Sequence, residues 1–156
     1  MALFPTRVLL ATDGSPTAEL AAGSAIELCQ STGSELHVVH VGEYLPTLLA
    51  YTEEEPMELQ TNAQRLLDEQ TQRLREAGGE VAQAHLRLGR PAEQIVNLSE
   101  ELGAGVIVVG SRGLGSLKRA LMGSVSESVV LHAHCPVFVV RPQGSTHRVG
   151  PPLRSR

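Results

Sequence analysis

The stretch VIVVGSRGLGSLKRALMGSVS, residues 106–126, contains a strand, a glycine loop and the start of a helix in immediate succession. Its glycines are Gly110, Gly113, Gly115 and Gly123. Glycine lets a backbone take positive φ and approach a ligand closely. Ser124 and Ser126 then stand where a helix begins, with amide N–H groups and the positive end of the helix dipole directed outward. This order of elements predicts a phosphate-binding site, and hence a bound nucleotide.

Around this stretch, apolar runs of β type alternate with segments of helical periodicity. We expect strands at residues 6–12, 35–41, 80–88, 105–109 and 136–141, and helices at residues 15–33, 56–77, 91–102 and 124–134. Such alternation is typical of a parallel sheet with helices on both faces. The sequence therefore predicts an α/β fold, a three-layer Rossmann-like sandwich around a five-stranded sheet.

The apolar content of each strand predicts its place in the sheet. Residues 8–11 and 106–109 are apolar on both faces, as in central parallel strands. Residues 81–88 instead carry Gln83, His85 and Arg87 on one face, which favours an edge. With right-handed crossovers the predicted order is 3-2-1-4-5. Its switch point lies between the first and fourth strands, so two loops are expected to meet there.

The fifth strand is predicted to form the other edge of the sheet. Its residues Val137, Phe138, Val139 and Val140 are all apolar. Soluble proteins rarely leave an apolar edge uncovered. We therefore expect a homodimer that pairs through this strand.

Length and charge restrict the class of protein. A chain of 156 residues, 42% of them apolar, fits a single domain, to which we assign residues 1–142, and residues 143–156 are expected to form a flexible tail. The formal net charge of −4 argues against nucleic acid or an acidic membrane as partner. Cys29 and Cys135 lie in apolar contexts outside any CxxC, which predicts buried free thiols. No apolar run approaches the ~20 residues of a membrane span, and without a secretory leader we expect a cytoplasmic protein.

The loop after the first strand, Thr12-Asp13-Gly14-Ser15, is expected to face the glycine loop. Asp13 is the only carboxylate in the two loops, placed to accept from a sugar or base, or to hold Mg²⁺ through water. An aspartate here is equally typical of a turn before a helix. Ser124 and Glu127 likewise fit a capping box, which needs no ligand. The basic side chains of the loop, Arg112, Lys118 and Arg119, suit either phosphates or solvent.

Standard phosphate-binding fingerprints do not fit this loop. GxxxxGK[ST] is absent, and the segment from Gly113 to Lys118 lacks the last glycine of GxGxxG. The loop also follows the fourth strand, whereas a dinucleotide fingerprint follows the first, which disfavours NAD. The spacing Gly110-x2-Gly113-x9-Gly123-Ser124 instead closely resembles the G-2x-G-9x-G-S signature of the ATP-binding subclass of the universal stress protein family. The resemblance extends from VLLATDGS at residues 8–15, through GRPA at residues 89–92, to CPV at residues 135–137.

This resemblance implies a five-stranded α/β fold, dimerisation through the last strand, and ATP, with or without Mg²⁺, held between the two loops. It implies that Asp13 contacts the nucleoside and that Val41 lines the adenine pocket. The ribose and phosphates would be bound by Gly110, Gly113, Gly123 and Ser124, with further contacts from Val125 and Ser126. The same predicted site includes Ala11, Thr12, Ser111, Arg112 and Gly115. Ala11 stands where ATP-binding members of the family often carry proline, which affects the placement of the base.

The leading hypothesis is an ATP-binding universal stress protein, a nucleotide-responsive regulatory module in the response to stress. One alternative is a slow Mg-dependent ATPase or phosphoryl-transfer enzyme that uses Asp13 with Mg²⁺. The two loops supply no evident base to activate water, which disfavours it. Another is a nucleotide-independent dimeric scaffold, in which the glycine loop is only architecture. His132 and His134 fall on different helix faces and predict no metal site, and His37 and His40 are interpreted as core or surface histidines.

Overall fold

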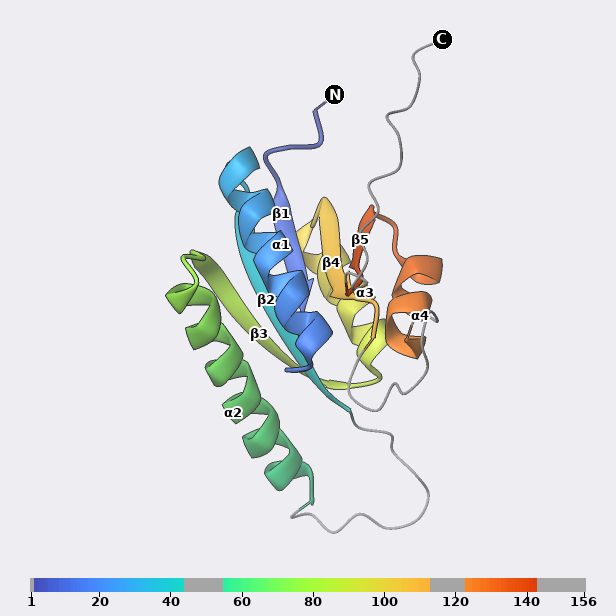
Figure 1. Cartoon of the computed structure of the whole chain (residues 1–156). Coiled ribbons are helices and arrows are strands. Elements are labelled where there is room, and N and C mark those ends of the chain that lie inside the picture. The colour runs from blue at the N-terminus through green and yellow to red at the C-terminus, as the bar shows by residue number, and fades with distance from the viewer. Residues whose placement is uncertain (1, 44–54, 113–122, 143–156) are drawn as a thin grey trace.

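The computed structural model describes residues 2–43, 55–112 and 123–142, in which four helices surround one sheet (Figure 1). The elements are β1 (Arg7–Ala11), α1 (Pro16–Thr32), β2 (Glu35–Glu43), α2 (Glu55–Glu76), β3 (Val81–Gly89), α3 (Pro91–Leu102), β4 (Val106–Gly110), α4 (Ser124–His132) and β5 (Val137–Val140). The sequence also predicts a loop at residues 42–55, and most of it, residues 44–54, lies outside the described residues, as do the tail, Gly113, Gly115, Lys118 and Arg119.

The sheet is parallel throughout, with five strands in the order β3-β2-β1-β4-β5. This confirms the predicted fold class and strand order. β1 is central because its Val8, Leu9 and Leu10 are fully buried and need cover on both faces. β3 and β5 form the two edges, as their composition predicted.

Helices cover both faces of the sheet. α1 and α2 pack on the face that carries Leu10, Val38 and Val108. α3 and α4 pack on the opposite face, against Leu9 and Ile107. Both faces are thus buried in apolar cores, and the loops at the carboxyl ends of the strands are left to carry polar chemistry.

Helix ends follow local signals in the sequence. α1 begins after Ser15, whose side chain accepts a hydrogen bond from the amide of Ala18, 3.2 Å away. It ends at Gly33, which adopts the left-handed φ of 70° that terminates many helices. α3 starts at Pro91 and ends before Gly103, with the predicted bounds.

Most element ends lie within one residue of the prediction, and two differ from it by two residues. β2 continues to Glu43 because its ladder with β3 extends through Gly42 and Leu88 to the end of both strands. α4 ends at His132 rather than at residue 134, because Ala133 is already extended, at φ −65° and ψ 143°. Both changes depend on pairing or backbone geometry beyond the local sequence pattern.

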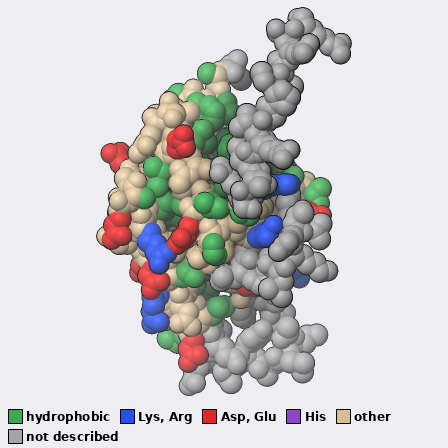
Figure 2. Space-filling view, in the orientation of Figure 1, with side chains coloured by type: hydrophobic (Ala, Val, Ile, Leu, Met, Phe, Trp, Pro, Cys, Tyr) green, Lys and Arg blue, Asp and Glu red, His purple; other side chains and the backbone are tan. Residues whose placement is uncertain are grey.

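Both cysteines are free thiols, as predicted, but only Cys29 is buried, whereas Cys135 is half-buried. Burial raises the pKa of Cys29 to about 11 and also raises the pKa of Cys135. Acidic and basic side chains are interspersed over the face that Figure 2 shows. Within the described ranges, no helix has both the length and the apolar character that crossing a membrane requires.

Candidate functional site

The loop after β1 forms a tight turn at the carboxyl edge of the sheet. The amide of Thr12 donates to the carbonyl of Val39 at 2.9 Å, which extends the sheet by one residue. The carboxylate of Asp13 accepts from the amide of Ser15 at 2.9 Å, and Gly14 takes a left-handed φ of 77°. Asp13 therefore shapes the turn, as its alternative interpretation predicted, while its half-buried side chain lies at the predicted edge.

The end of β4 is tied to this turn through the carbonyl of Arg112. The hydroxyl of Thr17 donates to that carbonyl, and the hydroxyl of Ser15 does so at 3.5 Å. On its other side, the amide of Ser111 donates to the carbonyl of Val140 in β5 at 2.8 Å. The two predicted loops therefore do meet. Sequence reasoning missed Thr17, whose signal is a buried threonine in the first turn of a helix.

Gly110 lies where β4 passes beneath α1. A Cβ atom added to it would lie 2.9 Å from both the carbonyl carbon and the oxygen of Thr17. Real Cβ atoms do not approach a backbone so closely. Close packing against α1 is therefore sufficient to require glycine at this position of the signature, with or without a ligand.

The start of α4 differs from the predicted capping box. Gly123 is the N-cap, extended at φ −63° and ψ 154°, and it has no side chain with which to cap the helix. Ser124 is the first helical residue and its side chain is not in the N-cap position, so the capping-box interpretation is wrong. The hydroxyl of Ser126 instead donates to the carbonyls of Gly123 and Ser111, at 3.0 Å and 3.2 Å.

A backbone bond also joins α4 to β4. The amide of Gly123 donates to the carbonyl of Ser111 at 2.5 Å. Together with Ser126 this holds the N-terminus of α4 against the end of β4. Ser124 and Val125, the next predicted site residues, are exposed there. The uncapped helix start thus lies at the same edge as the turn after β1.

The remaining predicted residues lie toward the α3 and α4 face. Ala11 and Val41 are partly buried at the margin of that core. The Nδ1 atom of His40 donates to the carbonyl of Thr12 at 2.8 Å, which joins β2 to the turn. His40 thus has a structural partner, as interpreted. In the part of the chain that the structure describes, no group of three or more His, Cys, Asp or Glu side chains could hold a metal ion.

Comparison with known proteins identifies relatives along most of the chain. The model of the universal stress protein family matches residues 5–141. A Thermus aquaticus protein named universal stress protein in QAH/OAS sulfhydrylase 3′ region is 38% identical over 144 residues, which cover 89% of this chain and 100% of that relative.

Solved structures agree on the fold. Universal stress protein UspA from Lactobacillus plantarum has a TM-score of 0.75 at 24% identity, over 88% of this chain and 99% of its own. A universal stress protein from Archaeoglobus fulgidus in complex with dAMP has a TM-score of 0.63 at 28% identity, over 89% and 99%. A further universal stress protein, solved in complex with cAMP, has a TM-score of 0.67 at 23% identity, over 86% of this chain and 96% of its own.

Proposed function

The chain belongs to the universal stress protein family, and on that premise we propose that it is a regulatory module that binds ATP where β1 and β4 end. The observation that carries the proposal is the uncapped N-terminus of α4, fixed to the end of β4 beside the turn that holds Asp13. Backbone amides of such a helix start, together with its dipole, favour phosphate groups. The complexes of two relatives with dAMP and cAMP support an adenine nucleotide as the ligand.

Each part of the edge has a role in this proposal. Ala11 and Val41 would line the base, the backbone of Thr12 would hold the turn in place beside it, and Asp13 would accept from the nucleoside. The amides of Gly123, Ser124 and neighbouring residues would receive the phosphates, with Gly110, Ser111, Arg112, Val125 and Ser126 around them, and Gly113 and Gly115 completing the signature. Mg²⁺ would accompany the phosphates as a counter-ion, reaching Asp13 through water.

The same edge is connected to the outermost strand of the sheet. Ser111, which receives two hydrogen bonds from the start of α4, donates its own amide to Val140 at the end of β5. Phe138 of β5 is 51% exposed, and Leu131 of α4 is 72% exposed. We include in the proposal a homodimer formed through β5, so that nucleotide at the α4 start acts two hydrogen bonds away from the end of β5.

Calorimetric titration with ATP, ADP, AMP and NAD tests the proposal, using the native chain and Gly123→Asp. The new carboxylate would occupy the N-cap, satisfy an amide of α4 and repel phosphate. We expect the native chain to bind ATP and not NAD, and Gly123→Asp to lose at least tenfold in ATP affinity while its thermal stability is unchanged or higher. AMP, with fewer phosphates, should be affected less.

Asn97→Asp is the matched control, since it adds the same charge on the exposed side of α3. Its ATP affinity should equal that of the native chain. Equal ATP affinity for Gly123→Asp and Asn97→Asp would show that the phosphates do not bind at the start of α4. Absence of ATP binding by the native chain would favour the nucleotide-independent scaffold.

A further inference from the structure

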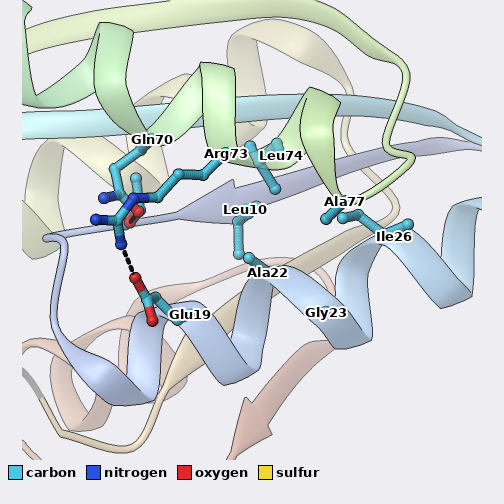
Figure 3. A pocket seen from close by; sticks show the side chains of 10 residues that line it. Leu10, Glu19, Ala22, Gly23, Ile26, Gln70, Arg73, Leu74 and Ala77 are labelled. Carbon is cyan, nitrogen blue, oxygen red and sulfur yellow. Dashed lines mark hydrogen bonds and ion pairs between the residues drawn. The ribbon is translucent and has the colours of Figure 1, made fainter.

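A cavity of about 280 Å³ lies between α1 and α2 (Figure 3), and one of its ends reaches Thr12 in the turn after β1. Its lining is mostly apolar and consists largely of Leu10, Ala22, Gly23, Ile26, Leu74 and Ala77. Leu10 belongs to the core under α1 and α2, whereas Val41 of the proposed base pocket packs toward α3 and α4. The cavity therefore lies on the opposite face of the sheet from the proposed base pocket.

Small side chains are what keep this space open. Ala22 and Gly23 of α1 face the cavity on one side, and Ala77 faces it just beyond α2. A Cβ atom added to Gly23 would meet no other atom within 4 Å. Larger side chains at these positions would close the gap between the helices, as they do at most helix contacts.

The cavity has one polar end. There the hydroxyl of Thr12 donates to the amide oxygen of Gln70 at 3.4 Å, and both side chains are buried. Because the amide oxygen accepts from Thr12, the amide nitrogen of Gln70 is the donor that a molecule in the cavity would meet. A few hydrogen-bonding groups within mostly apolar walls are the usual pattern of a small-molecule pocket.

The mouth of the cavity is crossed by an ion pair. Arg73 of α2 reaches over to Glu19 of α1, as the dashed line in Figure 3 shows. Their side chains are 63% and 48% exposed. Exposed ion pairs contribute little stability, so this one opens at small cost and does not block access.

We infer that this cavity binds a small, uncharged, apolar molecule that carries one hydroxyl or carbonyl group. The apolar body fills the space between α1 and α2, and the polar group bonds to the amide of Gln70. An engineered apolar cavity of roughly 150 Å³ is enough for benzene, so the present volume suits a substituted ring or a branched chain of similar size. A triphosphate is excluded because its charges would be buried against apolar walls.

This site goes beyond nucleotide binding and is tested without nucleotide. The probe is p-cresol, titrated into the full ¹⁵N-labelled chain and followed by amide chemical shifts, with toluene as the analogue that lacks the hydroxyl. Saturable shifts are expected at Thr12, along α1 and around residues 70–77 of α2. They should be weaker for toluene. Gln70→Leu should abolish the preference for p-cresol over toluene.

Gly23→Leu fills the cavity and should weaken p-cresol binding at least tenfold. Gly23→Ala is the matched control, because it also replaces the glycine but adds only one carbon to the cavity. It should bind p-cresol within about twofold of the native chain. Ala22→Leu provides a second filling variant. Equal binding by the two filling variants and the native chain, or saturable shifts confined to other parts of the protein, would overturn the inference.

Discussion

At the scale of single residues, the glycines of one signature serve different physical needs. Gly110 has no room for a side chain because the backbone of Thr17 lies against it. Gly123 has an ordinary extended backbone that any residue can adopt, and its missing side chain leaves the start of α4 uncapped. Sequence spacing alone could not separate the two, because the neighbour of Gly110 lies on a distant helix. Packing thus explains the glycine at position 110, and a substitution of Gly123 is the better test of ligand binding.

Gly110→Ala should lower the free energy of unfolding by about 1–3 kcal/mol, because backbone atoms at 2.9 Å cannot yield without moving α1. Gly23→Ala is the reference substitution and should raise stability by about 0.5–1 kcal/mol, since it improves helix propensity in open space. Urea denaturation of the two variants measures both effects. A neutral Gly110→Ala would contradict the packing explanation.

Thr17→Val keeps the shape of the side chain and removes the hydroxyl that binds the carbonyl of Arg112. We expect a loss of about 1 kcal/mol in stability, typical of one hydrogen bond, and weaker ATP binding because the two loops lose a direct link. Thr61→Val is a suitable control, since the Thr61 hydroxyl bonds only within exposed α2. Urea denaturation and calorimetry on both variants measure the losses of stability and of ATP affinity. Identical ATP affinities of Thr17→Val and Thr61→Val would argue against a positioning role for Thr17.

At the scale of elements, β2 and β3 share a pair of histidines, His37 and His85, whose contact the sequence did not predict. The Nδ1 atom of His37 lies 3.1 Å from the Nε2 atom of His85, and their rings stack. The other nitrogen of His37 lies 3.2 Å from the carboxylate of Glu35. Only one proton fits between the two rings. Protonating both histidines would place two N–H groups against each other.

This pair predicts how stability depends on pH. Burial, followed by the charges of His37 and Arg87, lowers the pKa of His85 below its usual 6.5, while Glu101 opposes the shift. The unfolded chain therefore binds more protons than the native chain below about pH 6.5, and stability falls as the pH decreases through that region. Denaturation midpoints across this range should show a smaller pH dependence in His85→Gln. An unchanged dependence would show that other groups cause it.

The elements also show how far local sequence reasoning extends. Strand order followed from which strands are apolar on both faces, and the bounds of α3 followed from Pro91 and Gly103. The predicted start of α4 at residue 124 is confirmed, but its N-cap was misassigned because Ser124 and Glu127 have capping-box spacing, while the true N-cap is Gly123. The links through Thr17 and Gln70, and the cavity itself, join segments distant in sequence. Local sequence patterns do not predict such long-range contacts.

At the scale of the whole molecule, the proposed nucleotide edge and the β5 edge are adjacent. The described residues place exposed apolar side chains on β5 and α4, among them Phe138, Val130 and Leu131. An uncovered apolar edge strand favours pairing with another chain. Nucleotide at the α4 start would therefore act on the surface that the proposed dimer uses.

Phe138→Asp should convert the dimer to a monomer, because the half-exposed ring would be replaced by a charge at the interface. Size-exclusion chromatography with light scattering measures the mass directly. Met57→Asp, at an exposed position on α2, is the control and should remain dimeric. A monomeric native chain at micromolar concentration would remove the dimer from the proposal.

If ATP binds where β1, β4 and α4 meet, titration of the ¹⁵N-labelled chain with ATP will change the amide chemical shifts of that edge. We expect saturable shifts at Asp13, at residues 110–112 and at residues 123–126, with little change along α3. Absence of saturable shifts at millimolar ATP, or shifts confined to the cavity between α1 and α2, would contradict binding at that edge.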